Sequence, residues 1–157
     1  MKGIFENKWV KRAGLVLLCA ALVYALIYAD VYLRARSAYL EGEKYYSWYL
    51  NPAEKNKALA EELAKEKAKL DGKLASGKMA KDEYAQQLEI IQFDNEQKLK
   101  ESSIKYAYIW YQTVVELFSP PETKYVKLAR EKMPKAKELW KKELTDKGVP
   151  FEDYMLE

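Results

Sequence analysis

The sequence has no histidine and only one cysteine, Cys19, among 157 residues. Without histidine, the chain lacks the side chain best suited to proton transfer near neutral pH and the commonest nitrogen ligand for zinc, copper and haem iron. A single cysteine excludes an internal disulfide, a CxxC motif and a cysteine metal cluster. We therefore expect no cofactor and expect packing to stabilise the fold.

Recognisable catalytic motifs are also missing. The sequence contains no glycine-rich nucleotide loop, zinc-protease motif, serine-nucleophile motif or calcium loop. Acidic pairs such as Glu61-Glu62 and Asp82-Glu83 lie in lysine-rich segments, where their spacing is typical of solvated helix faces and ion pairs. The 27 basic and 24 acidic residues nearly cancel and alternate along the chain, which disfavours nucleic acid as a partner. The sequence thus predicts a protein that is not an enzyme.

One long apolar run is present near the amino terminus. Residues 13–29 carry no charge, and apolar residues continue past Asp30 to Leu33. A helix over residues 13–33 would be about 30 Å long, enough to cross the hydrocarbon core of a bilayer. Trp9 before the run suits an interfacial aromatic belt. We predict a single transmembrane helix over residues 13–33, which contacts the lipid bilayer.

A cleaved signal peptide is the alternative interpretation of this run. The run is long for a signal core, continues as an amphipathic helix, and offers poor cleavage sites at Cys19 and after Ala29, so we expect a retained signal anchor. The flanking basic residues are Lys2, Lys8, Lys11 and Arg12 before the run, and Arg34, Arg36 and Lys44 after it. This asymmetry predicts a cytoplasmic segment over residues 1–12 and, in a bacterial inner membrane, a periplasmic domain.

The predicted membrane helix carries a stripe of tyrosines in its second half. Tyr24, Tyr28 and Tyr32 recur every fourth residue and therefore share one helix face. An ordinary interfacial belt explains such a stripe. Because the hydroxyls require hydrogen-bond partners, contact with another membrane subunit, a quinone or a pigment is the alternative. The three tyrosines are candidate partner-binding residues.

The rest of the chain, residues 34–149, predicts an all-α soluble domain. Two apolar stripes at helical spacing flank a glycine turn: Leu59, Leu63, Leu70 and Leu74, then Tyr84, Leu88, Ile91 and Leu99. Asn51-Pro52 precedes the first stripe and is a turn signal. Gly77 can adopt the left-handed conformation that closes a helix. The pattern predicts an antiparallel coiled-coil hairpin over residues 53–101, in which Asn95 falls among the facing positions.

The middle of this hairpin, from Leu70 to Leu88, resembles the short helical hairpins called SHOCT modules. These modules pair leucine with a glycine turn and an acidic-aromatic helix start, as in Gly77 and Asp82-Glu83-Tyr84 here. The chain departs from that pattern at Ala80, where a capping serine or threonine is expected. The resemblance implies that the hairpin is a protein-interaction element.

Two more helices are predicted after the hairpin, the second with Pro134 as a kink or break. The run from Ala107 to Pro121 looks like the second helix and turn of a tetratricopeptide repeat, as in bacterial envelope scaffolds. The segment from Ala38 to Tyr46 is similar to the first helix of such a repeat, with Gly42 at the close-packing position. The resemblance implies a single helix pair, interrupted by the hairpin. A generic helical bundle is the other interpretation, because no repeat period of about 34 residues is present.

Aromatic residues are abundant, with 13 tyrosines and four tryptophans, and such residues anchor protein interfaces. Four of them fall within five positions and must point to several sides of a helix: Tyr45, Tyr46, Trp48 and Tyr49. The tail, residues 150–157, carries further apolar side chains in a segment too short to bury itself. We expect Phe151, Tyr154 and Leu156 to dock on a partner subunit, the alternative being that they fold back on this chain.

These features together predict a non-catalytic, membrane-anchored accessory subunit that scaffolds a larger membrane protein complex through helical and aromatic surfaces. Its partners would be other protein subunits of that complex. The alternative is a periplasmic tetratricopeptide-like adaptor or assembly factor that binds its client transiently. A small ligand-binding or enzymatic subunit ranks third, since the sequence lacks histidine, cysteine pairs and a nucleotide loop.

Overall fold

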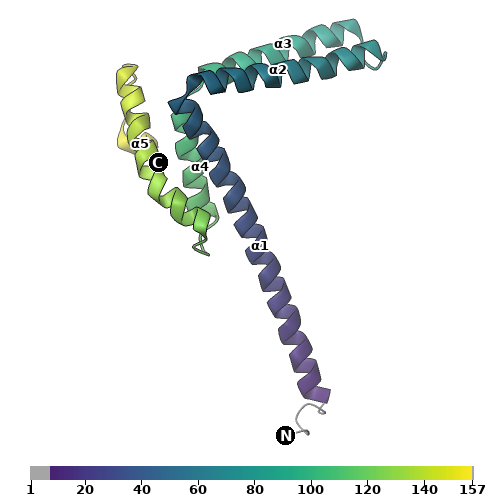
Figure 1. The fold of residues 1–157 in the computed structure, drawn as a ribbon, viewed down its shortest axis with the longest axis vertical. Coiled ribbons are helices and arrows are strands. Elements are labelled where there is room, and N and C mark those ends of the chain that lie inside the picture. Colours follow the sequence, from purple (N-terminus) through teal and green to yellow (C-terminus); the bar gives the residue numbers. More distant parts are fainter. Residues whose placement is uncertain (1–7, 157) are drawn as a thin grey trace.

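The computed structural model describes residues 8–156, and over that range the chain is entirely helical, as predicted (Figure 1). The five α-helices and one short 3-10 helix are α1 (Lys8–Leu50), α2 (Pro52–Ala75), α3 (Lys81–Lys100), α4 (Ser103–Leu117), α5 (Lys124–Asp146) and η1 (Asp153–Leu156). Most of the segment predicted to be cytoplasmic, including Lys2, lies outside the described residues.

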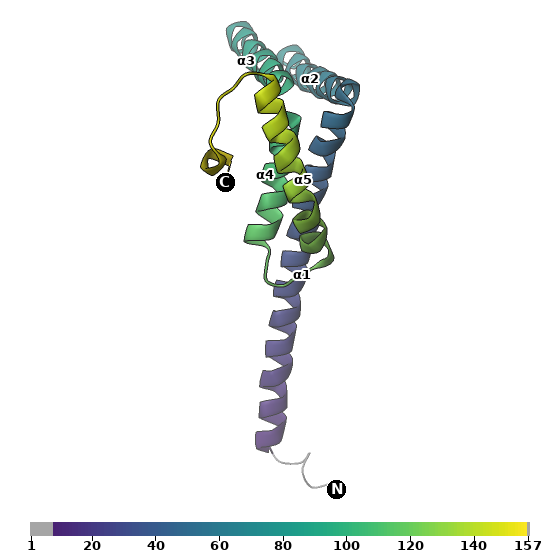
Figure 2. The same cartoon turned by 90° about the vertical axis from the view of Figure 1, so that its left-hand side faces the viewer.

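The longest element, α1, is one uninterrupted helix of 43 residues (Figures 1 and 2). The prediction that it continues past Asp30 toward Tyr46 is confirmed, and the absence of any proline from Lys8 to Leu50 explains why. The helix ends where Asn51-Pro52 was expected to end it. Pro52 then occupies the start of α2, where its missing N–H leaves no intrahelical bond unmade.

The upper half of α1 forms a three-helix bundle with α4 and α5 (Figure 2). Helix α4 runs antiparallel to α1, and α5 runs antiparallel to α4 (Figure 1). The buried core of this bundle consists of small residues and large aromatics: Ala35, Ala38, Tyr39, Ile104, Ala107, Tyr108, Tyr111, Val114, Val126, Ala129, Ala136, Trp140 and Leu156. Helices α1 and α4 therefore pack together although α2 and α3 separate them in the sequence.

Helices α1 and α4 approach each other closely at Gly42. A Cβ added to Gly42 would stand only 2.7 Å from Cε1 of Tyr111, so the ring lies directly against the glycine backbone. Tyr111 is fully buried there. The absence of a side chain at Gly42 allows the two helices to approach this closely.

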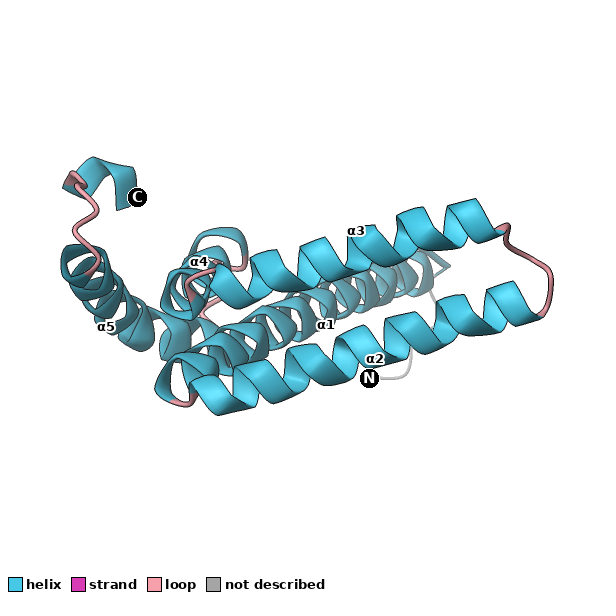
Figure 3. Ribbon diagram, turned by 90° about the horizontal axis from the view of Figure 1, so that it is seen from above, coloured by secondary structure: helices cyan, strands magenta, loops and turns pink. Residues whose placement is uncertain are grey.

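Helices α2 and α3 lie side by side in opposite directions and project sideways from the upper end of α1 (Figures 1 and 3). Gly77, with φ of +68°, closes the turn between them as predicted. The facing residues include Leu59 and Leu70, both buried, and Asn95, whose Nδ2 donates to the Leu59 carbonyl at 2.9 Å. Leu99 does not belong to this seam, because its side chain is 40% exposed.

Of the kink or break predicted at Pro134, the break does not occur, because α5 continues through it from Lys124 to Asp146. Pro134 is exposed, and only the backbone bond to the carbonyl four residues earlier is lost there. Both bundle helices after the hairpin begin with side-chain caps. Ser102 Oγ accepts from the N–H of Lys105 at 3.1 Å, and Thr123 Oγ1 accepts from Val126 at 3.4 Å.

Candidate interaction surfaces

The lower half of α1 is an apolar rod. Every residue from Trp9 to Asp30 is exposed, and the most apolar window of the helix has a mean hydropathy of 2.2. Exposure of this much apolar surface on one helix is unfavourable in water. The helix is long and apolar enough to cross a membrane, which makes it the candidate span.

The tyrosine stripe changes its surroundings along α1. Tyr24 and Tyr28 are 70% and 43% exposed, so both present ring surface to the outside. Tyr32 is half-buried, and its ring meets that of Tyr125 on α5 edge-on, with centroids 5.4 Å apart. The upper tyrosine therefore attaches α1 to the bundle, while the lower two remain accessible.

The aromatic cluster at the top of α1 is half-buried at all four positions predicted to bind a partner: Tyr45, Tyr46, Trp48 and Tyr49. Tyr45 stacks on Tyr106 of α4 at 5.3 Å between centroids and meets Trp48 edge-on at 5.2 Å. Tyr46 and Tyr49 pack against the bundle core. Each ring thus keeps one face in this chain's own packing and leaves only part of its surface for a partner.

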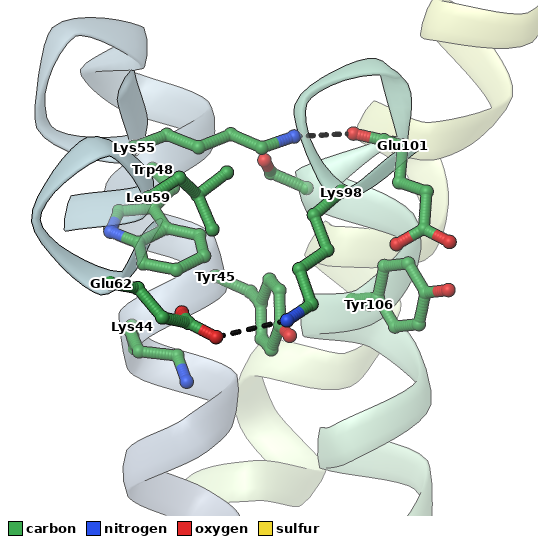
Figure 4. A pocket seen from close by; sticks show the side chains of 10 residues that line it. Lys44, Tyr45, Trp48, Lys55, Leu59, Glu62, Lys98, Glu101 and Tyr106 are labelled. Atoms are coloured by element: carbon green, nitrogen blue, oxygen red, sulfur yellow. Dashed lines mark hydrogen bonds and ion pairs between the residues drawn. The ribbon is translucent and has the colours of Figure 1, made fainter. Parts of the chain in front are cut away.

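A small cavity of about 200 Å³ lies where the hairpin joins the bundle (Figure 4). Its most buried charged member is Lys55 of α2, only 7% exposed, whose Nζ donates to the carbonyls of Leu99 and Glu101 at 3.1 and 2.6 Å. A lysine in this position satisfies the free carbonyls and the negative end of the α3 dipole. Burial lowers the pKa of Lys55, against the opposing effect of nearby carboxylates.

The other two lysines of this cavity also have partners. Lys98 pairs with Glu62 of α2 at 2.9 Å and with Asp94 at 3.1 Å, and hydrogen bonds to these carboxylates raise the pKa of Lys98. Lys44 pairs with Glu41 and lies over the Trp48 ring, 5.3 Å from its centroid. Because each ammonium group is already paired, the cavity is better described as a joint than as an anion site.

A polar clamp connects all three bundle helices. The Tyr111 hydroxyl of α4 donates to Glu43 Oε1 of α1 at 2.6 Å, and Lys132 Nζ of α5 donates to the two oxygens of Glu43 at 2.7 and 2.5 Å. Burial opposes ionisation of Glu43, but these hydrogen bonds prevail and hold its pKa below the ordinary value. Burial and the bond to Glu43 raise the pKa of Tyr111, which keeps the phenol protonated.

The outer face of α3 carries two large exposed side chains. Ile90 is 57% exposed and Phe93 is 62% exposed. Residues three apart are neighbours on a helix surface, so the two side chains form one apolar patch on the projecting hairpin. The seam with α2 uses other positions, such as Leu88 and Ile91, which are half-buried.

The tail folds back on this chain (Figure 2). Of the three tail residues predicted to dock on a partner, two pack in or against the bundle core. Leu156 is only 3% exposed and belongs to the bundle core, and Phe151 is partly buried against that core. Lys141 of α5 pairs with Asp153 at 3.0 Å and fixes the start of η1. Burial in the chain's own core leaves Leu156 no surface for a partner, whereas Tyr154 is 69% exposed.

Several residues that organise these surfaces were not identified from the sequence. Lys55 lies four residues before Leu59, in line with the apolar stripe, and that spacing was the available signal for its burial. Glu43 and Lys132 are 89 residues apart, and no local pattern connects them. For Ile90 and Phe93, the available signal in the sequence was their apolar character at positions outside the predicted seam.

Among residues 8–156, no group of three or more histidine, cysteine, aspartate or glutamate side chains could hold a metal ion. Comparisons with protein-family models, with curated proteins and with solved structures find no match to this chain.

Proposed function

We propose that this chain is a non-catalytic, membrane-anchored scaffold subunit of a larger membrane protein complex. Residues 13–33 cross a bacterial inner membrane, the amino terminus lies in the cytoplasm, and the bundle lies in the periplasm. The observation that carries the proposal is the continuity of α1: a single helix is both the candidate span and a core element of the bundle. The basic residues before the apolar run support this orientation.

The continuous helix α1 carries the hairpin, which projects sideways from its upper end (Figure 1). We call this combination of α1 and the hairpin the bracket. From Leu33 to Leu50 the helix rises about 25 Å, so the hairpin would leave α1 at that height above the bilayer. The 20 residues of α3 reach about 30 Å sideways. A rigid bracket of this kind raises the effective concentration of its binding faces at one position near the membrane.

The contact surfaces in this proposal are the side chains that remain exposed. They are Tyr24 and Tyr28 in the membrane, part of Trp48 at the joint, Ile90 and Phe93 on the hairpin, and Tyr154 in the tail. The resemblance of the hairpin to SHOCT modules supports an interaction role. Partly exposed aromatic side chains are typical anchors of protein interfaces.

A second candidate is a tetratricopeptide-like adaptor that binds a client transiently. The observation that favours it is the antiparallel pairing of α1 with α4 across the inserted hairpin, with Gly42 against Tyr111. Isolation from native membranes in detergent and high salt separates the two proposals. A subunit stays in constant ratio with its partners, whereas an adaptor is lost.

The bracket itself is tested by Leu33→Pro, with Leu33→Ala as the matched control. Leu33 is 58% exposed and is the last residue of the proposed span. Proline there should kink α1 by about 20° or more, which moves the hairpin tip by about 13 Å when the bracket dimensions above are used. We expect the proline variant to remain in the membrane but to lose its partners, while the alanine variant keeps them. Recovery of partners at the wild-type ratio with proline would contradict rigid placement.

A further inference from the structure

The connection between α4 and α5 descends along the lower part of α1 (Figures 1 and 2). We call residues 117–121 the α4–α5 turn. Pro120 and Pro121 of this turn line an apolar cleft of about 270 Å³ together with four residues of α1: Tyr24, Ile27, Tyr28 and Val31. All four belong to the proposed membrane span, so the turn lies at the level of the span and not above it.

The surface of the turn is apolar. Leu117 is 71% exposed, Pro120 is exposed, and no charged residue occurs between Leu117 and Pro121. Phe118 behind them packs against the bundle core. An exposed apolar tip beside a membrane helix is costly in water and favourable in the boundary between lipid headgroups and acyl chains.

Part of the polar surface of the turn is paired within the chain. Ser119 Oγ donates to Glu122 Oε1 at 3.0 Å, and Arg130 pairs with the same carboxylate at 2.5 Å. The Pro121 carbonyl accepts from the N–H of Thr123 at 2.8 Å. The two prolines have no N–H to leave unpaired. These features lower the free-energy cost of moving the turn from water into the headgroup region, where water remains for the other backbone groups.

The depth of the turn matches that interface. Asp30 is the first charge after the apolar run, and it pairs with Arg34 at 2.9 Å on the exposed surface of α1. Measured from Leu33, where the proposed span ends, the four α1 residues of the cleft lie about 3–14 Å to the bilayer side along the helix axis. Interfacial protein segments insert about 5–10 Å into the headgroup and acyl boundary, a depth that falls within this range.

We propose that the α4–α5 turn is a second membrane contact, which inserts Leu117 and Pro120 into the outer leaflet of the bilayer that α1 crosses. The inference rests on the proposed function, since it requires α1 to span that membrane. A single spanning helix can change its tilt in a bilayer, whereas a second contact beside the helix restricts that tilt. The second contact therefore fixes the angle between the hairpin and the membrane plane.

Depth-dependent fluorescence quenching tests this inference on the full chain in vesicles of phosphatidylcholine with a minority of phosphatidylglycerol. The native Cys19, exposed in the middle of the span, is labelled first and reports the insertion of α1 itself. In a Cys19→Ala background, Pro120→Cys and, separately, Leu117→Cys then carry the same environment-sensitive probe. Ser76→Cys is the matched control, because Ser76 is exposed and belongs to the turn between α2 and α3, which lies far from the lower half of α1 (Figure 1).

We expect lipids with a nitroxide near the headgroup to quench both turn probes strongly, while aqueous iodide quenches them weakly. The Ser76 probe should show the reverse. If Cys19 is quenched by lipid but both turn probes respond to iodide, the turn lies in water and the inference is wrong while the anchor stands. Protection of the turn probes from both quenchers would mean that protein covers the turn, which also overturns the inference. If Cys19 is not quenched by lipid, the anchor fails and the inference fails with it.

Discussion

Replacing Gly42 by alanine tests how closely α1 and α4 pack. The new Cβ would lie 2.7 Å from Cε1 and 2.8 Å from Cδ1 of Tyr111, whereas ordinary van der Waals contact begins at 3.4 Å. The ring would have to retreat by about 0.7 Å. It has little room to do so, because Tyr111 is fully buried, its hydroxyl donates to Glu43 at 2.6 Å, and its ring packs against Tyr39.

Two effects of opposite sign determine the result. Overpacking a well-packed site costs about 1–3 kcal/mol. Glycine to alanine within a helix contributes about 1 kcal/mol of helix propensity in return. The net destabilisation of Gly42→Ala is therefore about 0–2 kcal/mol. Gly72→Ala in α2 isolates the gain in helix propensity, because a Cβ there would meet nothing within 4 Å and therefore causes no overpacking.

Thermal unfolding of the full chain in detergent micelles measures both variants, with far-ultraviolet circular dichroism for the helices and near-ultraviolet dichroism for the packed rings. Gly42→Ala should unfold at a lower temperature than the wild type, and Gly72→Ala at the same or a higher one. In a Tyr111→Leu background the cost of Gly42→Ala should vanish, since the shorter side chain leaves room for the methyl group. Equal stabilisation by the two alanine substitutions would refute the close contact.

Three further predictions concern the clamp, the hairpin and the tail. Burial opposes the ionised form of Glu43, but its hydrogen bonds lower the pKa from 4.5, so the stability they contribute is present above that pH and is lost as the pH falls through the folded-state pKa. Glu43→Gln should therefore flatten acid unfolding profiles between those two pKa values. Leu70→Asp should abolish hairpin helicity in circular dichroism, because it buries an unpaired charge, whereas Ala68→Asp on the exposed face should not. Leu156→Ala should lower the free energy of unfolding of the bundle by about 2–5 kcal/mol in urea titrations, and Tyr154→Ala should leave it unchanged.

The features that the sequence predicted well depend on local patterns. Helical spacing of leucines indicated the hairpin, and Leu59 and Leu70 are indeed buried in its seam. Gly77 indicated the turn, and its positive φ agrees with that role. The unbroken course of α1 followed from the absence of proline, which is a local property too. Each of these predictions needed only a helix period and the known behaviour of glycine and proline.

The features that it did not predict depend on contacts between distant segments. A break at Pro134 was one of two outcomes expected for α5, but the helix continues through this exposed proline, and Ala136 and Trp140 after it are buried in the bundle core. Lys55 was not singled out from the sequence, and its burial depends on the end of α3 lying within reach of its ammonium group. The return of Leu156 to the core required knowing where α5 ends relative to α4. Periodicity within one segment contains none of this information.

One face of α1 runs from the proposed membrane span into the bundle. The face that packs on α5 through Tyr32 and Tyr39 continues downward as Tyr28 and Tyr24, beside the α4–α5 turn. The hairpin projects from α1 on the side away from α5 (Figures 1 and 3). In the proposed scaffold, a partner at Tyr24 and a partner at Phe93 would therefore contact different elements of the chain, α1 and the hairpin. Since α1 has no break between these surfaces, movement of one partner about the helix axis would be transmitted to the other, which is the mechanical property that a scaffold between two subunits requires.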